Sequence, residues 1–294
     1  MTPTEGILGL LTAAVAGNPA SVFIEKVSAA IEGGLKPWQL RRVASAEMDA
    51  AVIKAEGDGK IAEIQQRAAL RVAAEEVRNQ RNIEAPIIKA LPNIREDAKP
   101  EEMDDDWLTN FFDKCRLISN EEMQSLWAQV LAGEANSPGA FSLRTINFLS
   151  ALSQEEAQSF KLLCSYNWKL KEGEILSIIF DIQDKHLPIK LSFQKFHHLR
   201  DIGLIEFQAG SFSNGYSLTR DKCVFLYSDK SFEVGYKVKP GMQEDEPAIS
   251  IGKVILTQIG LELASICQPD YDERIIEYVM KNWQDSYTIL PINT

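Results

Sequence analysis

The chain has 294 residues, of which 45% are hydrophobic and 25% charged, a composition that fits a folded globular protein and excludes a disordered or fibrous one. Its formal net charge of -11 argues against a protein that coats nucleic acid non-specifically, because an acidic surface repels phosphate. The length is enough for two domains, or for one domain and an extended arm.

The cysteines and the first residues point to a cytoplasmic protein. The four cysteines are far apart, without a Cys-x-x-Cys pair or a histidine at ligand spacing, and are Cys115, Cys164, Cys223 and Cys267. We therefore expect buried free thiols in a reducing cytoplasm and no metal site. Met1 is followed by no basic segment, and the apolar stretch from Ile7 to Ala16 is too short to cross a bilayer, so neither a signal peptide nor a membrane span is expected.

Residues 1–34 are expected to form an amphipathic helix region. Asn18 can cap a helix that begins at Pro19 and runs to about Glu32, before Gly33 and Gly34. Its apolar side chains recur at helical spacing and are Phe23, Val27, Ala30 and Ile31.

Residues 35–100 are expected to form a long helical arm followed by a linker. The segment from Pro37 to Glu84 is rich in Ala, Glu, Gln and Arg, with a break expected near Gly57 and Gly59. Its mixed charges fit either a solvated face or a surface that packs against other copies of the same helix. The linker is marked by Pro86, Pro92 and Pro100.

Residues 101–169 are expected to form a small helical bundle. The acidic run from Glu101 to Asp106 favours a helix start over a metal cluster, because carboxylates stabilise the first turn of a helix. Capping boxes at Ser119 with Glu122 and at Ser153 with Glu156 predict two further helices, and a fourth lies between them around Leu143, Ile146 and Leu149. Trp127 is on the apolar face of the helix that begins after Ser119, and it is predicted to anchor the core of the bundle.

Residues 170–294 combine helix and strand patterns. An apolar helix is expected over 175–180, and a helix beginning at Ser192 should bury Phe193, Phe196 and Leu199 before it meets a strand at Gly203. Asn214-Gly215 predicts a hairpin turn, and a second hairpin is expected between 232–238 and 249–256, around an acidic loop at 243–247. A helix in "LTQIGLELASI" and a final helix from Tyr271 to Trp283 follow.

This order of helices and strands resembles a winged-helix domain, in which the helix before the wing often enters the DNA major groove. Residues 185–239 carry nine Lys or Arg against five Asp or Glu. The candidate residues for binding nucleic acid or a protein partner are Gln194, Lys195, His198 and Arg200. The predicted fold class is mainly α within α+β: a long N-terminal helical arm, a small bundle and a C-terminal winged-helix-like domain.

Catalytic motifs are missing from the sequence. It has no phosphate-binding Gly-x-x-x-x-Gly-Lys, no Gly-x-Gly-x-x-Gly, no His-Glu-x-x-His and no Gly-x-Ser-x-Gly. We therefore predict no catalytic residue, no metal ligand and no cofactor.

The stretch "LISNEEMQSLWAQVLAGEANSPGAFSLRTINFLSALSQEEAQSF" within Trp107 to Tyr166 resembles the uncharacterised bacterial family called domain of unknown function 2806. A shorter part of it, a Trp-containing helix followed by a small-residue turn and "LS..EA", is similar to abortive-infection alpha type phage-defence proteins. The resemblance implies a bacterial, anti-phage setting and no particular chemistry.

Three functions are compatible with these features. The leading hypothesis is a non-enzymatic sensor or scaffold that forms homo-oligomers through the arm and binds a protein partner. The second is a winged-helix regulator that binds nucleic acid. The third is a membrane-acting defence effector in which Ile7 to Ala16 and the Phe23 helix insert after oligomerisation.

Overall fold

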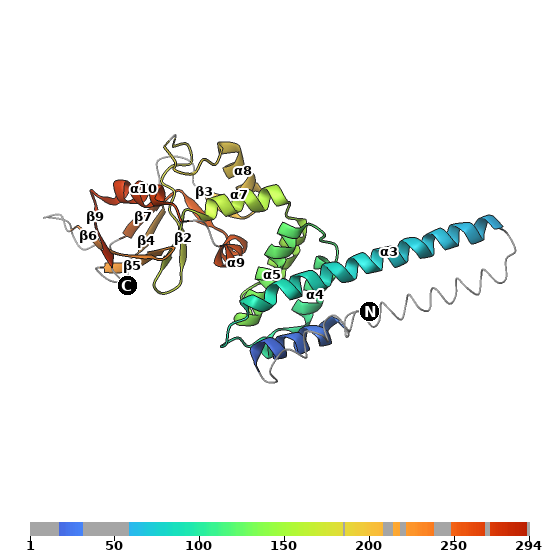
Figure 1. Ribbon diagram of the computed structural model, residues 1–294. Coiled ribbons are helices and arrows are strands. Elements are labelled where there is room, and N and C mark those ends of the chain that lie inside the picture. The colour runs from blue at the N-terminus through green and yellow to red at the C-terminus, as the bar shows by residue number, and fades with distance from the viewer. Residues whose placement is uncertain are drawn as a thin grey trace. The chain divides into compact units, whose positions relative to one another are not determined.

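The computed structural model describes residues 18–31, 59–184, 186–207, 214–217, 222–237, 248–267 and 271–292. The chain is an α+β protein that divides into two compact units, Met1–Ala151 and Leu152–Thr294 (Figure 1). The described elements of the first unit are all helices, and the described strands belong to the second.

The first unit begins with the expected amphipathic helix, which spans residues 19–31. The Asn18 side chain accepts a hydrogen bond from the Ser21 amide at 2.8 Å, which confirms the predicted cap. Phe23 and Val27 are buried, as their spacing predicts. The segment from Ile7 to Ala16 lies outside the described residues.

The arm contains helix α3 (Gly59–Ala90), the long cyan helix of Figure 1, whereas residues 37–58 lie outside the described residues. The helix was expected to end at Glu84 and to give way to a linker at Pro86, and this is wrong, because Pro86 is inside α3. Ile83, Ile87 and Ala90 are buried and α3 packs on α5 (Glu121–Asn136), so tertiary packing outweighs the local cost of the proline.

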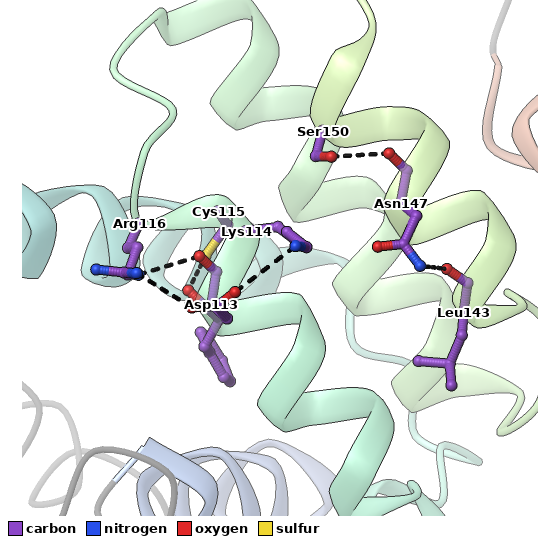
Figure 2. Close-up of polar contacts among 8 residues, drawn as sticks. Asp113, Lys114, Cys115, Arg116, Leu143, Asn147 and Ser150 are labelled. Atoms are coloured by element: carbon purple, nitrogen blue, oxygen red, sulfur yellow. Dashed lines mark hydrogen bonds and ion pairs between the residues drawn. The ribbon is translucent and has the colours of Figure 1, made fainter. Parts of the chain in front are cut away.

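Two short 3-10 turns, η1 (Leu91–Asn93) and η2 (Pro100–Glu102), lead to α4 (Asp105–Cys115). The acidic run is a helix start, as predicted: the Asp104 side chain accepts from the Trp107 amide, and the next two residues place carboxylates in the first turn. At the other end, Asp113 pairs with Arg116 at 3.2 Å and with Lys114 at 3.7 Å (Figure 2).

The capping residue of α5 differs from the prediction by one position. Asn120 caps the helix by accepting from the Met123 amide, so the expected box at Ser119 and Glu122 is wrong. The Ser119 hydroxyl instead accepts from the Asn82 amide nitrogen at 3.0 Å, and Asn82 also donates to the Arg116 carbonyl at 2.8 Å. Buried Asn82 therefore fixes α3 against the turn before α5.

The core of the first unit is aromatic. Trp127 on α5 is fully buried, as predicted, and meets Phe111 edge-on with ring centroids 5.0 Å apart. Phe111 also stacks on Trp107 at 5.2 Å. The expected third helix is α6 (Leu143–Ala151), which contacts α4.

The second unit opens with α7 (Gln154–Cys164), where both hydrogen bonds of the predicted box between Ser153 and Glu156 are present. The sequence pattern had grouped this helix with the preceding bundle. Strands β1 (Asn167–Leu170) and β2 (Ile175–Ser177) follow and pair antiparallel, so the helix expected over 175–180 is wrong. An apolar run this short has no periodicity that separates a helix from a strand. The segment is a strand because it pairs with β1.

A five-stranded antiparallel sheet has the order β2-β1-β5-β6-β9. β5 (Lys222–Tyr227) and β6 (Lys230–Tyr236) form a hairpin, and β6 also pairs with β9 (Tyr287–Ile292). The expected pairing of 232–238 with 249–256 is therefore wrong, and the acidic loop at 243–247 lies outside the described residues. Trp168, Phe225 and Trp283 meet in the buried core beside this sheet.

Two separate two-stranded sheets include the strands that follow α8 (Phe193–Asp201). β3 (Ile205–Phe207) pairs with β8 (Val254–Leu256), and β4 (Asn214–Ser217) pairs with β7 (Ala248–Gly252). Asn214-Gly215 is thus inside a strand and is not the predicted turn. Helices α9 (Gln258–Ile266) and α10 (Glu273–Trp283) confirm the last two predicted helices.

Candidate functional site

Helix α8 carries all four candidate binding residues and is fixed at both ends. The Ser192 hydroxyl accepts from the Lys195 amide at 3.3 Å and caps the helix, as predicted. Phe196 and Leu199 are buried as expected, but Phe193 is 43% exposed, so its predicted place on the inner face is wrong. At about 100° per residue, Phe193 lies about 60° from Phe196, at the edge of the buried face.

Three of the four candidates line one groove, which has a volume of about 310 Å³ and runs between α7 and α8. Its α8 side is formed by Gln194, Lys195 and His198, and its α7 side by Ser153, Glu155, Glu156 and Ser159. The two helices are in contact, and both belong to the second unit (Figure 1).

A histidine–carboxylate pair crosses the groove. His198 Nε2 lies 2.7 Å from Glu156 Oε1, while Glu156 Oε2 accepts from the Ser153 amide at 2.7 Å. The backbone hydrogen bond from Ser153, helped by His198, lowers the pKa of the Glu156 carboxyl below its ordinary value. One carboxylate thus caps α7 and holds α8.

The fourth candidate, Arg200, lies on a different face of α8. Its guanidinium donates to the Asp201 carboxylate at 2.7 Å and stacks over the Phe207 ring at 5.0 Å from the centroid. This hydrogen bond lowers the pKa of Asp201. The four candidates therefore do not form one site, because Arg200 points away from the groove that the others line.

His197 belongs to an aromatic cluster on the same side as Arg200. Its ring lies 4.2 Å from Phe193 and 5.0 Å from Phe207, between centroids. It was expected to be a surface partner of His198, but it is partly buried, and its Nε2 has no hydrogen-bond partner among the described residues.

A second cavity, of about 540 Å³, lies in the first unit beside Trp107 and Phe141. Buried Glu134 accepts from the Gly139 amide at 2.7 Å and from the Phe141 amide at 2.9 Å, and Trp107 Nε1 donates to the Phe141 carbonyl at 2.7 Å. These bonds fix the turn before α6. Sequence reasoning missed Glu134, whose only signal is a carboxylate on the apolar face of α5.

The α7–α8 groove places Gln194, Lys195 and His198 opposite two carboxylates and two serines. A carboxylate that is bonded to one ring nitrogen of a histidine orients the imidazole. The Glu156 carboxylate does this for His198, and it also caps α7. Within the described ranges, no group of three or more His, Cys, Asp or Glu could hold a metal ion. No helix in that part of the chain is long and apolar enough to cross a membrane. The groove offers donors from α8 and acceptors from α7 to a polar partner.

Comparison with known proteins identifies the family. A family model described as "Protein of unknown function (DUF2806)" matches residues 66–280, from α3 into α10 and far beyond the stretch that first suggested the likeness. No curated protein and no solved structure matches the chain, and the abortive-infection resemblance therefore remains a hypothesis. Because the family model covers more than half of the chain, this protein belongs to the DUF2806 family of proteins of unknown function.

Proposed function

We propose that this protein is a non-enzymatic scaffold or sensor that acts as a homo-oligomer, and that α3 joins its copies. The observation that carries the proposal is a stripe of exposed apolar side chains on α3. Leu70 is 64% exposed, Val77 55% and Ile88 52%. They are separated by seven and eleven residues, so at about 100° per residue they lie within about 20° of one line. We call these three residues the α3 stripe.

The part of α3 that carries most of this stripe has no buried residue between positions 63 and 78. Residues 63–78 are exposed or half-exposed, whereas buried positions begin at Asn79 and include Ile83 and Ile87. A helix gains most of its stability in water from burial of an apolar face, and no other described segment covers the stripe. A second copy would bury it.

The charges beside the stripe favour a parallel second copy. Arg67, Arg71 and Arg78 lie on one side of the line through Leu70, where Arg71 also pairs with Glu75 at 3.5 Å, and Glu76 and Glu84 lie on the other. In a parallel pair of helices, the Arg edge of each faces the Glu edge of its partner. An antiparallel pair would bring like charges together.

The test is the mass of the full chain in solution. We expect an oligomer at micromolar concentration that dissociates in the Leu70→Glu, Val77→Glu variant. The matched control is Ile64→Glu, because Ile64 is 59% exposed on the same helix but lies about 120° from the stripe. A monomeric wild type, or equal dissociation in both variants, would show that the stripe does not join copies.

Orientation is tested separately by disulfide crosslinking. Ile88→Cys, at the C-terminal end of the stripe, should crosslink to itself in a parallel pair, because equal positions then face each other. In an antiparallel pair centred near Leu70 and Val77 the two Ile88 positions lie far apart. Failure to crosslink in an otherwise intact oligomer would therefore contradict the parallel arrangement.

The setting that we propose is bacterial anti-phage defence. It is supported by the abortive-infection resemblance around Trp127 and by nothing in the geometry of the groove. The test is phage plating on cells that express the wild-type chain or the stripe variant. Protection by the wild type alone would support both parts of the proposal, and equal plating on wild-type and empty-vector cells would remove the defence setting.

A second candidate is a winged-helix regulator that binds nucleic acid. It is favoured by one observation, that α8 leads directly into the β3–β8 ribbon and α9 follows, the order of a recognition helix and its wing. Against it, His198 and Arg200 are already paired with carboxylates. Titration with duplex DNA at about 50 mM salt tests whether the protein binds nucleic acid. If it does, the double variant Lys195→Ala, Arg200→Ala should lower the affinity.

A further inference from the structure

Strand β9 forms one edge of the five-stranded sheet (Figure 1). On one side it pairs with β6 along its whole length, and no other described strand pairs with its opposite side. The edge at the far end of the sheet differs, because β2 is only three residues long and contacts β8 and α9. An uncovered edge strand offers its backbone to a strand of another chain.

The register of the β6–β9 ladder shows which backbone groups of β9 face outward. The Lys237 amide donates to the Ser286 carbonyl at 3.0 Å, so these two residues form a hydrogen-bonded pair. Hydrogen-bonded and non-hydrogen-bonded pairs alternate along an antiparallel ladder. Ile289 comes three positions after Ser286, so its pair with Val234 is a non-hydrogen-bonded one. The N–H and C=O of Ile289 therefore point away from β6, toward the uncovered side.

Pro291 fits the same arrangement. It also occupies a non-hydrogen-bonded position, opposite Phe232, so the ladder with β6 loses no donor at the proline. On the uncovered side Pro291 presents a carbonyl but no N–H. A second strand can therefore form both hydrogen bonds at Ile289, whereas at Pro291 it can only donate one.

The edge carries exposed apolar side chains and no charge. Leu290 is 56% exposed and Ile292 is 38% exposed. Charged side chains often protect the edge of a sheet from pairing with other chains. Residues 286–292 contain none, although the chain has a net charge of -11. This strand is therefore a place where two copies of an acidic protein can approach each other.

We propose that β9 pairs antiparallel with β9 of a second copy, about a two-fold axis at Ile289. In this register the two Ile289 residues face each other and exchange both backbone hydrogen bonds. The two Pro291 residues lie on opposite sides of the axis and do not face each other. Leu290 of each copy lies beside Thr288 of the other, so the pairing covers part of its exposed side chain.

Charge favours a second copy over a different partner. A charged peptide would find no opposite charge along residues 286–292, whereas two uncharged strands bring no like charges together. The nearest charged residue is Asp285. In the proposed register the two Asp285 residues are eight positions apart along the strands, or about 27 Å. That separation is well beyond the Debye length of about 8 Å at physiological salt, so their repulsion is screened.

This contact goes beyond the one proposed for α3. β9 belongs to the Leu152–Thr294 unit, whereas α3 belongs to the Met1–Ala151 unit. A single pair of short strands buries less than the roughly 1,200 Å² of a stable interface, so the pairing is weak and depends on protein concentration. Each copy then carries two separate surfaces for other copies, which can link copies into assemblies larger than a dimer.

The test is disulfide crosslinking of the full-length protein, which captures a weak contact. Ile289→Cys should form a crosslinked dimer under mild oxidation, because facing residues in a hydrogen-bonded pair have Cα atoms about 5.5 Å apart, a distance that a disulfide spans. Leu290→Cys is the matched control, since its two copies are two residues out of register and about 8 Å apart, too far to bridge. Leu290 is more exposed than Ile289, so random collisions would favour the control.

We expect at least about fivefold more dimer from Ile289→Cys than from Leu290→Cys, because only the first pair meets the geometry of a disulfide. The yield should not change when Leu70→Glu and Val77→Glu are added. Equal or reversed yields, or loss of the crosslink in that background, would overturn the proposal. If the α3 stripe does not join copies, the Ile289→Cys crosslink still forms, so the two proposals fail separately.

Hydrogen exchange of the wild-type chain gives a measurement that needs no substitution. The Ile289 amide should exchange more slowly as the protein concentration rises from about 1 to 100 µM, because pairing protects this outward-facing group. Amides of β2, at the opposite edge of the sheet, are the control and should keep their rates. An Ile289 rate that is independent of concentration would contradict the pairing.

Discussion

His198 Nε2 and Glu156 Oε1 lie 2.7 Å apart, so the middle of α8 is held against the first turn of α7. The hydrogen bonds from Ser153 and His198 stabilise the charged form of Glu156 in the folded state and so lower its pKa. Their contribution to folding stability is fully present above the ordinary carboxyl pKa. It is lost as the pH falls through the lowered value.

Glu156→Ala should therefore cost about 1 kcal/mol of unfolding free energy at neutral pH, the usual value of a helix cap. The difference from wild type should shrink in acid, where the wild-type carboxylate becomes protonated. Urea denaturation at both pH values measures this. Glu155→Ala, one position away and outside the cap, is the control, and an equal loss in both variants would contradict the role of the cap.

Glu134→Gln is expected to destabilise the first unit by about 2 to 3 kcal/mol. The buried carboxylate accepts from two amides, and a Gln side chain has one oxygen and would turn an N–H toward the other amide donor. Chemical denaturation measures the loss. Exposed Glu101→Gln is the control and should change stability by less than about 0.5 kcal/mol. A Glu134→Gln protein as stable as wild type would mean that the turn before α6 is held by other contacts.

Trp127→Ala should cost about 3 to 5 kcal/mol, because the ring is fully buried against Phe111. Trp127→Phe should cost much less, since the indole N–H has no hydrogen-bond partner among the described residues and only part of the ring is removed. Thermal melts of the two variants show which one loses more stability. Equal losses would indicate that the N–H is bonded after all.

Gly260→Ala tests how closely α9 approaches the α8–β3 junction. Helix propensity alone would favour Ala by about 1 kcal/mol. A Cβ at this position would, however, lie 2.1 Å from the Leu204 carbonyl oxygen, so we expect a loss of about 3 kcal/mol. Gly139→Ala, where a Cβ meets nothing within 4 Å, should lose only about 1 kcal/mol through its φ of +85°. A more stable Gly260→Ala protein would contradict the close packing.

Helix starts were predictable because their signals are local. Asn18, Asp104, Ser153 and Ser192 each accept a hydrogen bond from an amide three residues ahead, so a few letters of sequence decide the cap. Ser119 shows the limit of this reasoning, because Asn120 competes for the same role and the contact with Asn82 settles the choice.

Strand pairing could not be predicted from local patterns. β6 was assigned a partner that is near it in sequence, but it pairs with β9 more than fifty positions away, as in Val234 with Ile289. The Asn-Gly pair at 214 has the composition of a turn and lies in a strand because β7 pairs with it.

Only the α8 side of the groove could be predicted, because contacts between distant segments leave no local pattern. The helical spacing of Gln194, Lys195 and His198 placed them on one side of α8, but Glu156 comes from α7, 42 residues before His198, and no pattern in α8 announces it. Arg200 lies on another face of α8, where its guanidinium lies over the ring of Phe207 on the strand that follows, and whether it binds a partner stays a prediction.

The pairing of β9 at the edge of the five-stranded sheet sets the order in which the protein can fold during synthesis. Its ladder with β6 runs from Tyr236 with Tyr287 to Ser231 with Ile292, so the sheet lacks this edge strand until residues 287–292 have been synthesised. The Met1–Ala151 unit has by then emerged whole. A nascent chain therefore presents an open edge on the β5–β6 hairpin after the first unit has been synthesised, and an open strand edge can pair with another chain.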